Sequence, residues 1–462
     1  MSPRPRLTEG PIGRTLVALS GPMLIGVFSI AFFNVVDTWF VGLLGGTELA
    51  AISFTFPVVM VIGSLTMGVG IGATSVVSRA LGAGKTEDVR RYTTDALMLA
   101  LSLVIVLSIV GSLTIDPLFR AMGATESTLP HIRAYMRVWY LGMVFLVVPM
   151  VGNSAIRATG DTRTPATIMV AAVLLNAVLD PILIFGIGPI PSLGLAGAAW
   201  ATVGARALAL VLSLRVLHFR ERMIDWSLVG PAEGLRSWGA ILTVGAPAAA
   251  TNMVVPLSFG VVTGMVARHG EFAVAALGAG SRVEMMATLV VMAVGAGLGP
   301  FAGQNWGAGR RDRLGRALIL AGRFSLGWGV FTWIIFATAG SLIARAFSPD
   351  PSTIDLIAVY LWLLPISHGL QGVHNITAAA FNAINRPLNA AALSLLKAPV
   401  LVLVLAWVGN QLFGIAGIFA GMALSNVVVG TLAHVWTRRL RGAGRALAEP
   451  PLPARDPVRA AR

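Results

Sequence analysis

Apolar segments recur along the chain and are separated by short polar stretches. A membrane-spanning helix needs roughly 20 mostly apolar residues, and each of these segments is long enough or nearly so. The predicted spans cover residues 16–41, 50–78, 96–115, 134–156, 165–187, 194–216, 238–267, 274–300, 318–346, 356–382, 388–409 and 414–437. The pattern predicts an all-α integral membrane protein with twelve transmembrane helices in two pseudo-symmetric six-helix bundles.

The polar stretches suggest five parts, which are listed here in chain order. We expect a cytoplasmic N-terminal segment (1–14), a first lobe (15–216), a cytoplasmic linker (217–237), a second lobe (238–437) and a disordered cytoplasmic tail (438–462). The basic N-terminal stretch precedes an apolar segment that lacks a small-residue cleavage site, so we interpret that segment as a retained span.

Composition agrees with a chain whose main solvent is lipid. Hydrophobic residues make up 56% and charged residues 12% of 462 positions, against about 25% charged in soluble domains. The net charge is +14, but the 34 basic residues are scattered between apolar segments, which argues against nucleic-acid binding. The absence of cysteine excludes disulfides and thiolate sites. We expect a monomer without a cofactor.

The distribution of lysine and arginine predicts the orientation. With the N-terminus in the cytoplasm, most basic residues fall in cytoplasmic loops and the tail. The exceptions on the opposite side are Arg120, Arg133, Arg137, Arg268 and Arg345. The positive-inside bias therefore predicts a multi-pass protein of a bacterial or archaeal inner membrane, with both termini cytoplasmic.

The two halves repeat each other. A shift of 225 residues aligns Pro22 with Pro247 and places residues 82–84 (GAG) on residues 307–309 (GAG). Because each half has an even number of spans, the repeat is parallel, with an axis along the membrane normal. A substrate site is expected between the two bundles.

Carboxylates inside predicted spans are costly and mark functional sites. Asp37 and Asp180 lie at similar depths, Asn34 shares a helix face with Asp37, and Asn176 shares one with Asp180. These oxygen-rich groups suit either a shared proton or a metal cation such as Na⁺, which Asp37, Asp180 and Asn176 would bind, and the residue types leave the choice open. The alternative is a structural pair neutralised by Arg206.

Further candidates surround this pair. Phe33 lies one turn before Asp37, and Pro22 would bend the same helix. Glu284 is a possible accessory group, which Arg282 would neutralise, and His368 and His374 are interpreted as satisfied core histidines. The candidate substrate-cavity residues are Phe33, Met67, Asn153, Met253 and Met285.

Several motifs resemble the multidrug and toxic compound extrusion family. They are GQNWGAGR at 303–310, SRALGAGK at 78–85, NVVDTWFVG at 34–42, RATGDTRTP at 157–165 and NAVLDPILIFG at 176–186. The resemblance extends from about residue 12 to residue 440 and implies an antiporter that exchanges cationic, amphiphilic drugs for H⁺ or Na⁺.

Acids in the first and fifth spans resemble the DinF-like branch. That resemblance implies a cation site of Asp37, Asp180 and Asn176, a bend at Pro22, and a contribution from Thr202, with Ala198 as the alternative. Phe33 stands where that branch often has tyrosine. Acids in the seventh and tenth spans, typical of the NorM-type branch, are absent.

Two alternatives to drug export are a lipid flippase and an integral-membrane enzyme. A flippase for lipid or lipid-linked substrates has the same architecture but would line its cavity with more basic residues. An integral-membrane enzyme would need clustered His, Asp or Ser at one membrane face, and the sequence shows no such cluster. We therefore expect a transporter, with small amphiphilic molecules and membrane lipids as its partners.

Overall fold

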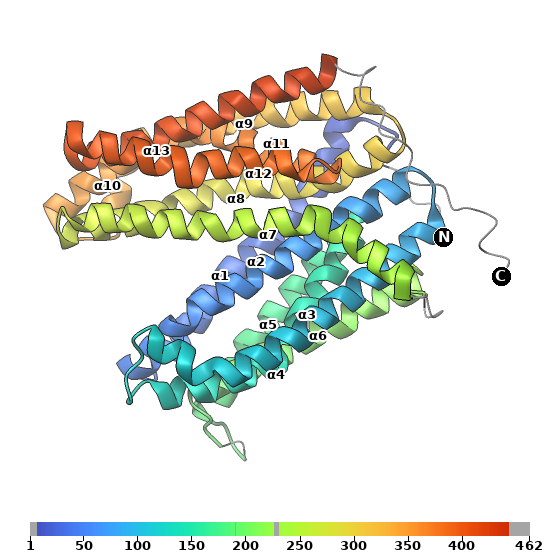
Figure 1. Cartoon of the computed structure of the whole chain (residues 1–462). Helices are drawn as coiled ribbons and strands as arrows, with labels where there is room; N and C mark the ends of the chain where they lie inside the picture. The colour runs from blue at the N-terminus through green and yellow to red at the C-terminus, as the bar shows by residue number, and fades with distance from the viewer. Residues whose placement is uncertain (1–6, 190, 226–230, 443–462) are drawn as a thin grey trace.

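The protein is a bundle of long helices that lie in two groups (Figure 1). The computed structural model describes residues 7–189, 191–225 and 231–442. The first group is α1 (Ile12–Gly42), α2 (Gly46–Gly82), α3 (Thr86–Ala121), α4 (Leu129–Ala158), α5 (Arg163–Phe185), α6 (Leu195–Arg215) and the π-helical η1 (Val216–Arg220). The second is α7 (Pro231–Ala267), α8 (Glu271–Gly307), α9 (Arg311–Arg345), α10 (Pro351–Leu363), η2 (Pro365–Ser367), α11 (His368–Ala383), α12 (Pro387–Leu395), η3 (Leu396–Val402) and α13 (Leu403–Gly442).

The described helices supply twelve membrane spans, although only eleven continuous apolar helical runs can be distinguished. The last run, residues 387–438, has 52 residues and would be about 78 Å long if straight, far more than a bilayer needs. Phe413 and Gly414 have non-helical backbone angles and divide it. Gly409 packs against Gly417 and Leu405 against Gly421, so the chain reverses at this kink. The prediction of twelve spans is confirmed.

The backbone repeats between the halves as the sequence does. Gly194, which precedes α6, has φ 54° and ψ −134°, and Gly414 has φ 60° and ψ −140°. Gly84 and Gly309 have φ values of 73° and 71°. Residues other than glycine rarely adopt backbone conformations with positive φ, so glycine is favoured at equivalent turns in both halves.

The two groups of helices meet at one end and diverge toward the other (Figure 1). We call these the closed end, where α1 begins and α13 ends, and the open end. At the closed end a Cβ on Gly82 of α2 would lie 2.0 Å from the carbonyl oxygen of Gln304 in α8, and one on Gly307 would lie 2.1 Å from that of Arg79. The shift of 225 residues exchanges these two contacts, so the crossing is pseudo-symmetric.

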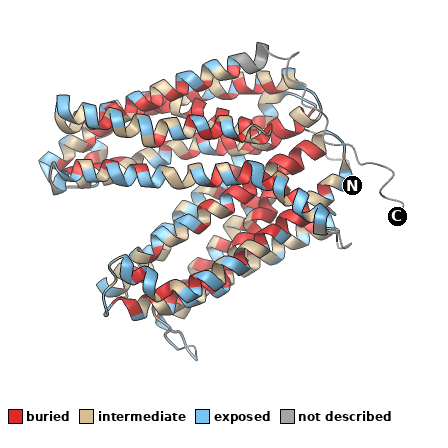
Figure 2. Cartoon of the chain, in the orientation of Figure 1, coloured by how far each residue is buried: buried red, intermediate tan, exposed pale blue. Residues whose placement is uncertain are grey.

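A second pair of contacts extends the closed end. Gly72 of α2 packs against Ile241 of α7, and Gly297 of α8 packs against Leu19 and Ser20 of α1. Buried residues gather where the groups meet, whereas the open ends are largely exposed (Figure 2). Close backbone contact at glycine therefore contributes to joining the two halves at this end.

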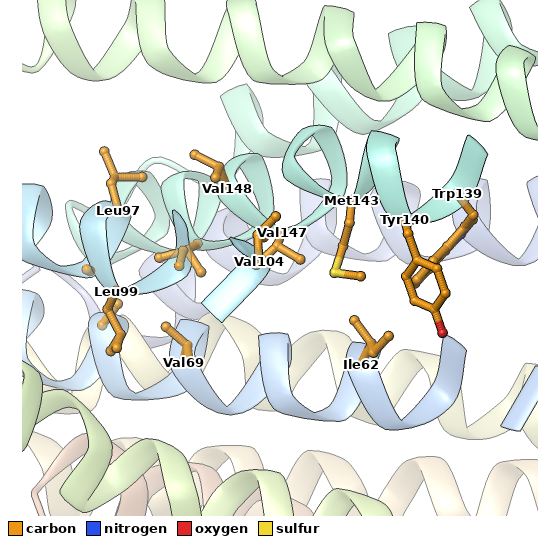
Figure 3. Close-up of a cluster of buried hydrophobic side chains, with 14 of the residues drawn as sticks. Ile62, Val69, Leu97, Leu99, Val104, Trp139, Tyr140, Met143, Val147 and Val148 are labelled. Atoms are coloured by element: carbon orange, nitrogen blue, oxygen red, sulfur yellow. The ribbon is translucent and has the colours of Figure 1, made fainter. Parts of the chain in front are cut away.

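Each half also has an apolar core of its own. In the first half, side chains of α2, α3 and α4 pack together, among them Ile62, Val69, Leu97, Leu99, Val104, Met143 and Val147 (Figure 3). Leu7, Leu16 and Leu19 pack with residues of the second half instead. The start of the chain thus belongs to both halves.

Helix boundaries differ from the prediction mainly at the closed end. α3 begins at Thr86 rather than residue 96, and α9 begins at Arg311 rather than residue 318. Acidic residues in these first turns favour the helix dipole, so polar sequence continues the helix beyond the apolar span. α7 begins at Pro231, inside the predicted linker, and the predicted disordered tail falls mainly on residues 443–462, outside the described residues.

Candidate functional site

Packing between α1 and α5 brings the two span aspartates to one level. Gly26 of α1 contacts Met169 of α5, and eleven residues separate Gly26 from Asp37 and Met169 from Asp180. The helices run in the same direction, so equal steps keep the two acids level. Asp37 and Asp180 also interact electrostatically. The predicted meeting of these side chains in the first half agrees with this geometry.

Asp180 is the most deeply placed member of the site. Its side chain is fully buried, and its Oδ1 accepts a hydrogen bond from Nδ2 of Asn176 at 3.3 Å. Its Oδ2 has no hydrogen-bond partner among the described residues. Asp37 is partly exposed. The site therefore offers a free carboxylate oxygen beside a second carboxylate that solvent can reach.

Tyr135 is a member of the site that the sequence analysis missed. It lies in α4, is almost fully buried, and interacts electrostatically with both Asp37 and Asp180. A single tyrosine in an apolar span has no distinguishing spacing. Only its depth, opposite the two acids on an antiparallel neighbour, could have identified it.

Thr202 of α6 lies at the level of Asp180. α5 and α6 are antiparallel, and Gly197 packs against Leu183 and Gly204 against Leu179. Residue 202 of α6 therefore lies at the same depth as residues 180 and 181 of α5. Ala198, the alternative, lies about a turn nearer the open end. Asn34 is exposed, and no hydrogen bond joins it to Asp37 within the described ranges.

Arg206 does not pair with the aspartates. Its Cζ lies 5.6 Å from the centroid of the Phe33 ring, a cation–π contact between α6 and α1. Among the described residues no ion pair joins Arg206 to Asp37 or Asp180, so the alternative of a neutralised structural pair is not supported. Phe33 instead holds a guanidinium beside the site.

The predicted cavity residues fall into two groups. Gly68 of α2 packs against Ala249 of α7. Met67 precedes Gly68, and Met253 lies one turn after Ala249, so both methionines lie where α2 and α7 begin to diverge. Met67 and Met285 are 47% and 45% exposed, and Met253 is partly exposed. Asn153 is buried inside the first half, and its Oδ1 has no partner among the described residues. The structure does not place it with the methionines.

The interpretation of Glu284 as neutralised by Arg282 is wrong. Residues two apart on a helix point to different sides, and Arg282 is exposed whereas Glu284 is largely buried. Glu284 instead accepts a hydrogen bond from the hydroxyl of Tyr360 at 2.5 Å, and its Oε1 lies 3.4 Å from Nε2 of His368. Pro22 lies within α1, which continues as a helix through it.

The GQNWGAGR segment ties the start of the chain to both halves. Gln304 Oε1 accepts from the backbone amide of Leu7 at 3.3 Å, and its Nε2 donates to the carbonyl oxygen of Ala158 at 2.8 Å. Asn305 donates to the carbonyl oxygen of Leu7 at 3.1 Å. Arg313 donates to the carbonyl oxygens of Glu9 and Gly10. These bonds latch residues 7–10 across the closed end.

Asp161 fixes the turn between α4 and α5 at the same end. It accepts bonds from the amide and hydroxyl of Thr164 at 3.0 and 2.6 Å, and it pairs with Arg220. Burial opposes ionisation, but the hydrogen bonds from Thr164 and the charge of Arg220 outweigh it and hold the pKa of Asp161 below its usual range.

Two bundles of six spans that meet at one end and diverge toward the other, with carboxylates buried within the spans, have the architecture of a membrane transporter. The family model described as MatE matches residues 22–182 and again residues 247–408. The chain belongs to the MatE family. The two matches cover corresponding parts of the two halves.

Relatives and solved structures cover nearly the whole chain. An FAD transporter of Shewanella oneidensis is 39% identical over 95% of this chain and 97% of that protein. A multidrug export protein of Staphylococcus aureus is 24% identical over 94% and 95%. The crystal structure of the MATE transporter VcmN of Vibrio cholerae, in the bent form, has a TM-score of 0.88 and 29% identity over 94% and 98%.

Proposed function

We propose that this protein is a secondary active exporter that expels amphiphilic organic compounds in exchange for H⁺ or Na⁺. The observation that carries the proposal is the first-half site, in which Asp180 is fully buried and leaves Oδ2 without a partner, beside Asp37 and Asn176. An ionised carboxylate in a span is costly unless a cation or proton neutralises it. Binding of either ion also removes repulsion between the two acids.

The contacts at the closed end support alternating access. Separating Gly82 from Gln304 and Gly307 from Arg79 would release both halves at once, because the contacts are equivalent. With the predicted orientation, the open end faces the cell exterior. Exposed Met67 and Met285 and the Phe33 ring supply apolar and aromatic surface for amphiphilic compounds.

The test uses everted membrane vesicles that take up a fluorescent cationic dye. They are energised separately by a proton gradient and by a sodium gradient, which identifies the coupling ion. Asp37→Asn and Asp180→Asn are expected to reduce ion-driven uptake to the level of vesicles without the protein, with normal membrane insertion. Glu126→Gln is the control, since Glu126 is exposed and pairs with Arg120. Undiminished uptake in both aspartate variants would refute the site.

A second candidate substrate is a flavin nucleotide, because the FAD transporter of Shewanella oneidensis is 39% identical over 95% of the chain. FAD combines flat aromatic rings with a pyrophosphate. The contact of Arg206 with Phe33 offers an aromatic face beside a cation, and exposed Arg282 offers a second cation. Vesicles supplied with FAD instead of the dye test this candidate. FAD uptake that is lost in Arg206→Gln and Arg282→Gln, with dye uptake retained, would favour it.

A further inference from the structure

The second half holds a buried polar cluster that the first-half site does not involve. Its centre is Glu284 of α8, whose Oε2 accepts from the Tyr360 hydroxyl at 2.5 Å and whose Oε1 lies 3.4 Å from His368 Nε2. Tyr360 and His368 are buried, whereas the Glu284 side chain is 16% exposed. Of these three side chains, the carboxylate is therefore the most accessible.

The two partners of Glu284 lie on opposite sides of a break in the tenth span. Tyr360 belongs to α10 and His368 begins α11, and between them η2 forms a short 3₁₀ turn that contains Pro365. Proline lacks an amide donor, so the helical ladder is interrupted there. The carboxylate of Glu284 thus bridges both segments from a neighbouring helix.

Packing fixes this bridge in place. A Cβ on Gly280, one turn before Glu284, would lie 2.5 Å from the Tyr360 ring, so glycine lets α10 approach closely. On the other side Ser325 Oγ of α9 donates to the carbonyl oxygen of Gly369 in α11 at 2.9 Å. Within η2 itself, Ser367 Oγ accepts from Asn426 Nδ2 of α13 at 3.0 Å. α10 and α11 are therefore held by different helices, and a change across η2 alters the angle between them.

Other charged groups complete the surroundings of Glu284. Lys397 in the π-helical η3 interacts electrostatically with Glu284, and His374 of α11 interacts with Lys397. Among the described residues, no hydrogen bond or ion pair joins Glu284 to α1, α2, α7 or α9. His368 Nδ1 has no hydrogen-bond partner in the same residues. Apolar side chains would pack such a site at lower cost, which indicates a use for the charges.

We propose that His368 and Glu284 form a second proton-binding site, whose occupancy sets the bend of the tenth span across η2. A proton from the aqueous phase binds His368 Nε2, and the resulting N–H donates to Glu284 Oε1 as an ion pair. Release returns that proton to water and leaves a neutral imidazole without the ion pair, while Tyr360 keeps its own proton. The ion pair therefore holds α10 and α11 at one angle when His368 is protonated, and its loss on deprotonation lets this angle change.

The bend can be measured without transport, so its failure is distinguishable from failure of the proposed export function. The chain has no cysteine, so Ser352→Cys at the exposed open end of α10 and Phe413→Cys at the exposed kink accept a pair of spin labels. α10 has 13 residues and is about 20 Å long, so a bend of about 20° moves its end by about 7 Å. Pulsed electron paramagnetic resonance on the purified protein measures the distance between the labels.

We expect the distance to change by about 5 Å or more between about pH 5 and about pH 8, the range in which histidine titrates. His368→Gln and Glu284→Gln are expected to abolish the change. His374→Gln, a matched buried histidine of α11 without a carboxylate partner, and Asp37→Asn are expected to retain it. If Glu284→Gln fails to fold, His368→Gln carries the test alone. A constant distance in the parent protein, or a change that persists in His368→Gln, would overturn the proposal.

Discussion

Gly82→Ala should open the closed end of the molecule. The added methyl carbon would lie 2.0 Å from the carbonyl oxygen of Gln304, which is backbone and cannot rotate away. Overpacking of this kind costs about 1–3 kcal/mol in the closed arrangement. Once the halves separate there is no clash, so the cost falls on one state only. The population of the separated state should rise roughly 5-fold to 150-fold.

A single introduced cysteine reports this opening. Ser78 is fully buried in the α2–α8 contact, close to Gly303, so Ser78→Cys is shielded while the end is closed. Its rate of reaction with a maleimide should rise with the separated population. Gly63→Ala is the matched control, because a Cβ on Gly63 in the same helix meets nothing within 4 Å. An unchanged rate in Gly82→Ala, or an equal rise in Gly63→Ala, would refute the reasoning.

Three further predictions concern smaller changes. Tyr135→Phe should shift the dependence of transport on coupling-ion concentration without reducing membrane insertion, and superimposable curves would show that its hydroxyl has no part in the site. Gln304→Ala removes the hydrogen bond of about 1 kcal/mol to the amide of Leu7, so that amide should exchange hydrogen about fivefold faster, as measured by mass spectrometry. Thr164→Val removes the hydroxyl hydrogen bond that helps to lower the pKa of Asp161, and the stabilisation from this bond is present at neutral pH and lost as pH falls through that pKa. The loss in Tm should thus be clear at about pH 7 and shrink as pH falls below the ordinary range of aspartate, about 4; an equal loss at neutral and at acid pH would contradict this account.

Sequence patterns predicted the twelve spans and the common depth of the two span aspartates. Twelve spans followed from apolar length, and the level of Asp37 and Asp180 followed from helical rise, because both depend on distances along one chain. The closed end could not be derived in this way. Its contacts join glycines to residues of the other half that are far away in sequence, and nothing near Gly82 indicates which carbonyl it will meet.

The case of Glu284 shows why nearest neighbours mislead. Arg282 is close in sequence, yet helix geometry turns the two side chains apart, and the true partners lie on other helices. Pro365 lies inside the predicted span 356–382, but the sequence did not reveal that a carboxylate would bridge the break that this proline causes. Local sequence patterns therefore cannot predict which residue of another helix a single polar side chain will contact.

The latch formed by Leu7 also has a consequence for biosynthesis. Its partners Gln304 and Asn305 follow it by almost 300 residues, and a ribosome adds about 5–20 residues per second. Leu7 therefore waits roughly 15–60 s for the groups that bind it. The first half can assemble in the membrane during that delay, but the end that joins the halves is sealed only after α8 has been made. Closure of this end therefore requires translation to have passed α8, the second helix of the second half.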